Sequence, residues 1–219
     1  INSDTIKNMI LGKDNTNTNL DFNDQPGNQI AGLGFSLSLL DAHNLNIYGQ
    51  YMGEDGLDPI IDDRWVGAIF PSKRFEMAGI KYSSINSTNG WNITFEHLDT
   101  DTGFPNVTYN HGLYKSGYRY KGFPLGAAID TDSHQSIIVF EKFFDQLSYS
   151  LKYEDMLLNQ NNSLQSRWNY ANAKNKQLTL KLNILHRESN KFELGFMVRN
   201  TNIPNVEKNI FFFRIEKQL

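Results

Sequence analysis

Apolar and polar residues alternate with a period of two along most of this chain. The clearest case is segment 177–186, where one set of positions holds Leu178, Leu180, Leu182 and Ile184 and the other holds Gln177, Thr179, Lys181 and Asn183. Successive side chains of a β-strand point to opposite faces, so this segment predicts a strand with one apolar and one polar face. The same alternation recurs in 29–40, 44–52, 76–84, 91–98, 147–154 and 192–199. Three less regular segments, 118–129, 136–144 and 208–216, also favour strands.

Turn residues separate these segments. Ser87-Thr88-Asn89-Gly90 and Glu188-Ser189-Asn190 are typical of tight connections between strands. Helical periodicity is weak and is confined to 2–11 and 159–173. The sequence therefore predicts an all-β chain of about ten antiparallel strands, forming one domain over 1–219.

Uniform alternation is compatible with two architectures. A soluble β-sandwich hides its apolar faces between two sheets, whereas an outer-membrane barrel turns its apolar face to lipid and keeps a polar lumen. The polar positions here include several small residues, among them Gly32, Gly34, Ser36, Ser38, Gly79 and Gly195. Aromatic residues gather near predicted strand ends, as in an interfacial belt: Tyr48, Tyr51, Trp65, Tyr82, Trp91, Tyr149 and Tyr153. These features favour the barrel, and the sandwich, with the same aromatics as cross-strand pairs, stays the alternative.

Composition narrows the possible partners. The net charge of −3 supplies no basic field for nucleic acid. Cysteine is absent, which excludes a disulfide framework and Cys-based metal or redox sites. No apolar run is long enough for a transmembrane helix, but a barrel strand needs only about ten residues.

The stretch from Tyr109 to Ser133 carries the most unusual chemistry. It combines four tyrosines, glycines, one arginine, one histidine and two aspartates. Flat aromatic faces and a forked guanidinium are suited to the C–H surfaces, hydroxyls and carboxylates of sugars. The candidate sugar-binding residues are Tyr114, Tyr118, Arg119, Tyr120, Asp130, Asp132, Glu54 and Asp55.

Other interpretations of these residues remain open. The tyrosines and Arg119 can instead fill a barrel lumen. The four acidic residues can bind a cation such as Ca²⁺, or form ion pairs with Arg119, Lys115 or Arg64. The histidines show no zinc-ligand spacing, so no metal site is expected. His134 and Ser136 share a strand face, but no third group that would orient the histidine for nucleophilic catalysis is evident. Glu96 and Asp99 are a conceivable carboxylate pair for glycoside hydrolysis. We expect that the protein is not an enzyme.

Four motifs, in order, resemble the Wzi family of capsule-assembly proteins. The first is Asn28-Gln29-Ile30-Ala31-Gly32 at a strand start, and the second is the run from Tyr48-Gly49-Gln50 to Gly53-Glu54-Asp55. The third is Phe95-Glu96-His97-Leu98-Asp99-Thr100. The fourth runs from Tyr114 through Gly117-Tyr118-Arg119-Tyr120 and Gly126 to Asp130-Thr131-Asp132-Ser133. Segment 6–15 is similar as well.

The resemblance implies a monomeric outer-membrane barrel in a bacterium. Such barrels have about eighteen strands, so this chain is expected to be a C-terminal portion. The implied function is non-enzymatic and needs no cofactor: binding capsular or related surface polysaccharide and attaching it to the cell. The expected partners are that polysaccharide and outer-membrane lipid. The alternatives are a porin-like channel for small polar solutes and a soluble β-sandwich lectin.

Overall fold

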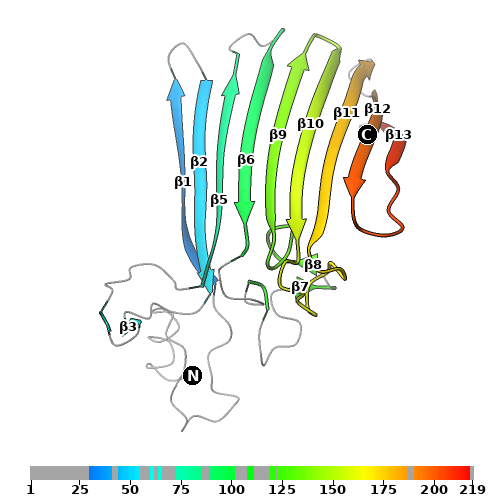
Figure 1. Cartoon of the computed structure of the whole chain (residues 1–219). Coiled ribbons are helices and arrows are strands. Elements are labelled where there is room, and N and C mark those ends of the chain that lie inside the picture. Colours follow the sequence, from blue (N-terminus) through cyan, green and yellow to red (C-terminus); the bar gives the residue numbers. More distant parts are fainter. Residues whose placement is uncertain are drawn as a thin grey trace.

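The fold is one wide antiparallel sheet that carries loops at one end (Figure 1). We describe a computed structural model over residues 30–40, 44–54, 60–61, 64–65, 73–84, 89–101, 108–110, 119–121, 123–186 and 190–217. Nine strands form the sheet in the order β1-β2-β5-β6-β9-β10-β11-β12-β13. Their bounds are Ile30–Leu40, Asn44–Glu54, Lys73–Ser83, Trp91–Asp99, His134–Phe143, Leu147–Leu158, Ala173–His186, Asn190–Thr201 and Asn209–Lys217.

Each of these strands pairs with the neighbour that precedes or follows it in this order, so the sheet is a meander. Two short antiparallel ribbons lie outside it: β3 (Ile60–Ile61) with β4 (Arg64–Trp65), and β7 (Arg119–Tyr120) with β8 (Phe123–Pro124). The all-β, antiparallel prediction is confirmed, and nine of the ten expected strand segments fall on strands of the sheet.

The register places most of the large apolar residues of the nine strands on one face. Across the middle of the sheet, Leu151 lies opposite Phe140 on β9 and Leu180 on β11. Phe95 lies opposite Ile80 and Ile138 in the same way. Large side chains on this face stay exposed, for example Leu180 at 50% and Phe211 at 80%. The sheet therefore presents a broad uncovered apolar surface rather than one side of a packed core.

The two ends of the sheet differ. At the upper end in Figure 1 the connections 41–43, 84–90, 144–146 and 187–189 are short. At the other end the connections 55–72, 100–133 and 159–172 are long, and only 202–208 is short. The buried apolar cluster of Ile129, Leu158 and Ala173 lies at this long-loop end, with Leu98 and Trp168 packed against it.

One local prediction was wrong. Segment 118–129 is no long strand: among its described residues only the short strands β7 and β8 form, and turns follow. The weak helix candidate 159–173 forms turns up to Asn172. Three of its asparagines (Asn159, Asn162 and Asn172) have positive φ, which ends helical geometry and which asparagine tolerates. The candidate helix 2–11 lies outside the described residues.

The described residues contain no second sheet packed on the first, as a sandwich would require. No helix among them is long and apolar enough to cross a membrane.

Candidate functional site

The insertion 100–133 leaves the sheet and returns to it between two neighbouring strands. It follows Asp99 at the end of β6 and ends before His134, which starts β9 and lies opposite Asp99. The backbone closes its base, because Thr100 donates its N–H to the Ser133 carbonyl at 2.9 Å. The Thr100 hydroxyl accepts the Ser133 N–H at 3.1 Å and donates to the Asp130 carbonyl at 2.5 Å. Thr100 and Ser133 thus form a buried neck that fixes the insertion to the sheet.

A buried ion pair organises the insertion above this neck. The Arg119 Nη2 atom lies 2.5 Å from Asp130 Oδ1, and the two side chains are 6% and 0% exposed. The same guanidinium donates to the Tyr109 carbonyl at 2.8 Å. Asp130 Oδ2 also accepts the backbone N–H of Arg167 at 2.8 Å. Asp130 Oδ1 accepts the Thr131 N–H as well, at 2.8 Å, so three partners compensate its buried charge, as burial of a carboxylate requires.

Another long connection, 159–172, docks onto the insertion through polar contacts. The Trp168 indole donates to the Ile129 carbonyl at 2.8 Å. Asn159 donates its backbone N–H to the Ser133 hydroxyl at 3.0 Å and its side-chain amide to the Trp168 carbonyl at 2.7 Å. The two connections therefore form one folded unit, which we call the loop cap (the described residues of 100–133 and 159–172).

The loop cap exposes an aromatic and cationic surface. Tyr120 is 65% exposed and Phe123 is 61% exposed. The Arg167 guanidinium lies over the rings of Phe123, at 5.1 Å, and Trp168, at 4.6 Å. Arg167 is exposed, and its guanidinium makes cation–π contacts with both rings. We call Tyr120, Phe123, Arg167 and Trp168 the stacked platform.

A pocket of about 300 Å³ lies between the cap and the sheet. Its walls include Gln50 and Glu96 from the sheet and Tyr109, Leu125 and Gly126 from the cap. The Tyr109 hydroxyl accepts the Ala127 N–H at 2.9 Å and so holds that ring against the turn at Gly126. Clefts of this size accommodate small ligands, so the pocket can receive one unit of a larger chain.

The eight predicted sugar-binding residues have different positions. Tyr114, Tyr118 and Asp55 lie outside the described residues, and Glu54 ends β2 with a side chain that also lies outside them. Arg119, Asp130 and Asp132 are buried, and the first two form the expected alternative, an ion pair. Tyr120 is exposed on the stacked platform. A role of these residues in sugar binding stays a prediction.

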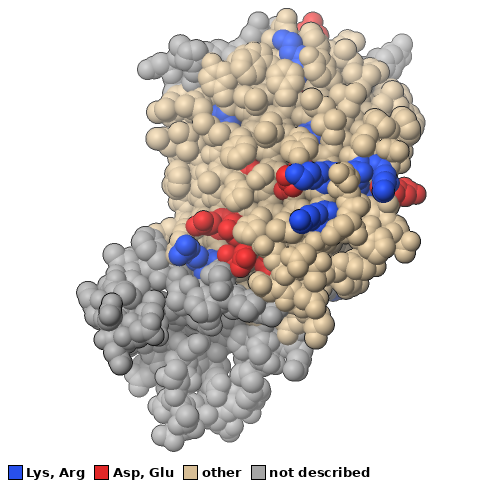
Figure 2. Space-filling model, viewed as in Figure 1, with Lys and Arg blue, Asp and Glu red and all other residues tan. Residues whose placement is uncertain are grey.

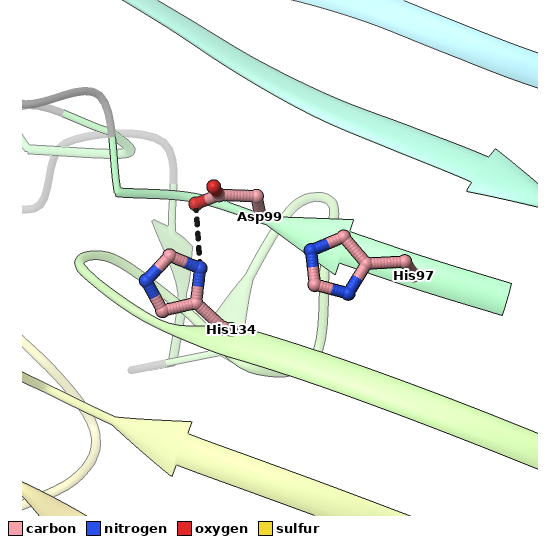
Figure 3. A group of neighbouring side chains, drawn as sticks. All are labelled: His97, Asp99 and His134. Carbon is pink, nitrogen blue, oxygen red and sulfur yellow. Dashed lines mark ion pairs between the residues drawn. The ribbon is translucent and has the colours of Figure 1, made fainter.

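Sequence reasoning missed two features. Arg167 and Trp168 fell in a segment interpreted as a weak helix, and the sequence alone gave no sign that they meet Phe123. The second feature is His97, Asp99 and His134, whose candidate ligand atoms all lie within 4.8 Å of one another (Figure 3). Spacing along the chain gave no motif, but antiparallel pairing of 91–99 with 134–143 would have placed Asp99 beside His134.

The group formed by His97, Asp99 and His134 lies at the long-loop end of the apolar face, where polar residues replace apolar ones. Across this end of the face run His97, Ser136, Asp155 and Lys176, which are cross-strand neighbours. Asp155 and Lys176 form an ion pair at 2.8 Å. Figure 2 shows a wide area over the strands with few charged side chains, and charges gathered toward the long-loop end.

Comparison with known proteins adds two findings. Residues 1–209 match the family described as Capsule assembly protein Wzi. The fold is similar to that of Wzi from Escherichia coli, described as an outer membrane protein involved in group 1 capsule assembly and a carbohydrate-binding β-barrel. The TM-score is 0.69 at 22% identity, over 84% of this chain and 40% of that chain, so this chain spans less than half of that structure's length. No curated protein matches the chain.

Proposed function

We propose that this chain, which belongs to the Wzi family of capsule assembly proteins, forms part of an outer-membrane barrel wall. The loop cap on that wall would bind capsular polysaccharide and hold it at the cell surface. The proposal goes beyond family membership in three respects: the lipid contact, the orientation and the residues that touch the sugar.

The apolar face of the sheet supports the lipid contact. A nine-stranded sheet with one face of exposed Leu, Ile and Phe side chains is costly in water, at about 25 cal/mol per Å² of apolar surface. The opposite face carries polar and charged groups such as Lys152 with Glu154 and Lys181 with Glu193. Apolar-out, polar-in alternation is the pattern of a barrel wall in a membrane.

The unequal lengths of the connections support an orientation. Outer-membrane barrels have short turns on the periplasmic side and long loops on the outside. The end with the loop cap would therefore face the exterior, where the capsule lies. The upper end in Figure 1, with its short turns, would face the periplasm.

The single observation that supports sugar binding most directly is the stacked platform. The exposed rings of Tyr120 and Phe123 offer flat apolar area, and the exposed Arg167 beside them offers N–H donors. The N–H donors of Arg119 are not available to a sugar in this way, because its side chain is 6% exposed and already contacts Asp130 and the Tyr109 carbonyl. Within the described residues, Arg167 is thus the better candidate for contact with a uronate carboxylate or sugar hydroxyls.

We also propose that the protein is not an enzyme. Ser136 Oγ does lie 2.9 Å from His97 Nδ1, and His134 Nδ1 lies 3.0 Å from Asp99 Oδ1. However, Ser136 sits inside β9 with paired strands on both sides. The hydrogen bonds between β9 and its two neighbouring strands use the backbone N–H groups that an oxyanion hole would need.

The test is the fraction of capsule that stays attached to cells. A strain deleted for the gene is complemented with the full-length wild-type gene or with the Phe123→Ala/Arg167→Ala double variant. We expect wild type to restore retention and the double variant to release capsule into the medium, with unchanged total synthesis. The matched control is Arg74→Ala, which removes an exposed arginine at the same end of the sheet but outside the platform.

Two results would contradict the proposal. Full retention with the double variant would remove the platform as the binding surface. Unchanged retention in the deletion strain would remove the attachment function itself and would favour a channel, which conductance of the purified protein in bilayers would then measure.

A further inference from the structure

We propose that His97, Asp99 and His134 bind a divalent transition-metal ion of the zinc type at the base of the insertion. This inference does not depend on polysaccharide attachment. It assigns a metal site where the sequence predicted none, and it gives the site a structural role, to clamp β6 to β9 where the insertion leaves the sheet.

The three side chains already face one another. His97 and Asp99 are alternate residues of β6 and share a strand face, and His134 is the cross-strand partner of Asp99. His134 Nδ1 lies 3.0 Å from Asp99 Oδ1. The two imidazole rings are nearly parallel, at 19°, with centroids 6.4 Å apart (Figure 3).

The spacing of the ligand atoms is close to what a tetrahedral ion needs. Zn²⁺ binds nitrogen and oxygen at about 2.0–2.2 Å, so its ligand atoms lie about 3.4 Å from one another. The candidate atoms lie within 4.8 Å of one another. Small rotations of side chains are enough to close this difference, and the paired backbone need not move.

The donor set selects the kind of ion. Two imidazoles and one carboxylate suit zinc and similar first-row metals, whereas Ca²⁺ and Mg²⁺ prefer oxygen ligands alone. Three protein ligands leave a coordination position for water.

Neighbouring groups support this assignment. Metal-bound histidines use their second ring nitrogen in a hydrogen bond that fixes the ring. His97 Nδ1 lies 2.9 Å from Ser136 Oγ, which leaves Nε2 for an ion. Asp101 Oδ2 lies 3.8 Å from His134 Nε2 and adds negative charge nearby. His134 and Asp99 keep 32% and 24% of their side-chain surface exposed, so an ion can reach the site from solvent.

The position of the cluster gives binding a consequence for the loop cap. Asp99 and His134 immediately precede and follow the neck residues Thr100 and Ser133. An ion that joins Asp99 to His134 would therefore fasten both ends of the insertion at one point.

The test is calorimetric titration of the full-length protein in detergent, stripped with a chelator, using Zn²⁺ as the probe. We expect one strong site in wild type, lost in His97→Gln, Asp99→Asn and His134→Gln. Loss of an outer-shell partner already costs about 10–100-fold in metal affinity, so loss of a direct ligand should cost about 100-fold or more. The matched controls are Asp155→Asn, a carboxylate in the neighbouring polar row, and His186→Gln, at the opposite end of the sheet. Both should bind as wild type does.

A second readout tests the clamp itself. Saturating Zn²⁺ should slow proteolysis within 100–133 in wild type and in both controls, and not in the three ligand variants. Far-UV circular dichroism confirms that each variant is folded. Absence of Zn²⁺ binding in wild type, or equal binding in the ligand variants and the controls, would overturn the site. Binding without a change in proteolysis would overturn the clamp.

Discussion

The strand wall and the loop cap are stabilised in opposite ways. Large apolar side chains of the wall remain exposed, as Leu33 is at 68%, and its polar groups lie mostly on the other face or near the strand ends. In the cap, Asp130, Thr131, Asp132 and Ser133 are fully buried around a small apolar cluster. The wall therefore needs a surrounding that accepts apolar surface, whereas the cap depends on hydrogen bonds and an ion pair among its buried polar groups.

Removal of the buried ion pair between Arg119 and Asp130 should cause the largest loss of stability. Asp130→Ala leaves the Arg119 guanidinium buried without its counter-charge, and we expect a loss of about 3–5 kcal/mol in the stability of the cap. Limited proteolysis and denaturant unfolding of the purified protein measure this loss. An unfolding curve equal to that of wild type would contradict the structural role of the pair.

The apolar face gives the next largest expected effect. Leu151→Arg places a charge between Phe140 and Leu180, and at the middle of a bilayer such a change costs about 2–4 kcal/mol. Folding into lipid vesicles measures it. The control is Ser150→Arg, on the polar face opposite Glu141 and Lys181, for which we expect a change within about 1 kcal/mol. Equal effects of the two changes would argue against lipid contact.

The neck of the insertion should be less sensitive. Thr100→Val keeps the volume but removes the hydroxyl that bonds the Asp130 carbonyl and the Ser133 N–H. A buried unsatisfied group costs about 1–3 kcal/mol. Hydrogen exchange at Ser133 should accelerate while exchange in the middle of β10 stays unchanged, and acceleration in both places would show that the neck is no separate unit.

The smallest effect is expected at an exposed ion pair of the wall. Arg74 Nε and Glu76 Oε2 are 4.0 Å apart, and both side chains are more than half exposed. Arg74→Met should change stability by about 0–1 kcal/mol, because solvent and salt screen such pairs. The same unfolding assay used for Asp130→Ala measures it, and a loss comparable with that of Asp130→Ala would remove the contrast between wall and cap.

The sequence predicted the wall far better than the cap. Period-two alternation such as Leu178-Thr179-Leu180 depends only on local geometry, so it marks both the strand and its faces. The segment 118–129 was misassigned because its aromatic residues favour strands while its turns follow from burial of Asp130. Arg119 and Asp130 were named as candidate sugar-binding residues, with an ion pair to Arg119 as one alternative, but the choice among partners depends on a tertiary contact. The same holds for Arg167 with Phe123 and for His97 with His134, which only strand pairing and loop docking bring together.

The order of the strands has a consequence for how such a protein diversifies. Because neighbours in the sheet follow one another along the chain, each long connection joins two strands that are already side by side. A connection with a sealed neck, like the one at Thr100 and Ser133, transmits little of its length or shape to the register beneath it. The insertion between Asp99 and His134 can thus change in length or sequence while the strands beneath it keep their pairing.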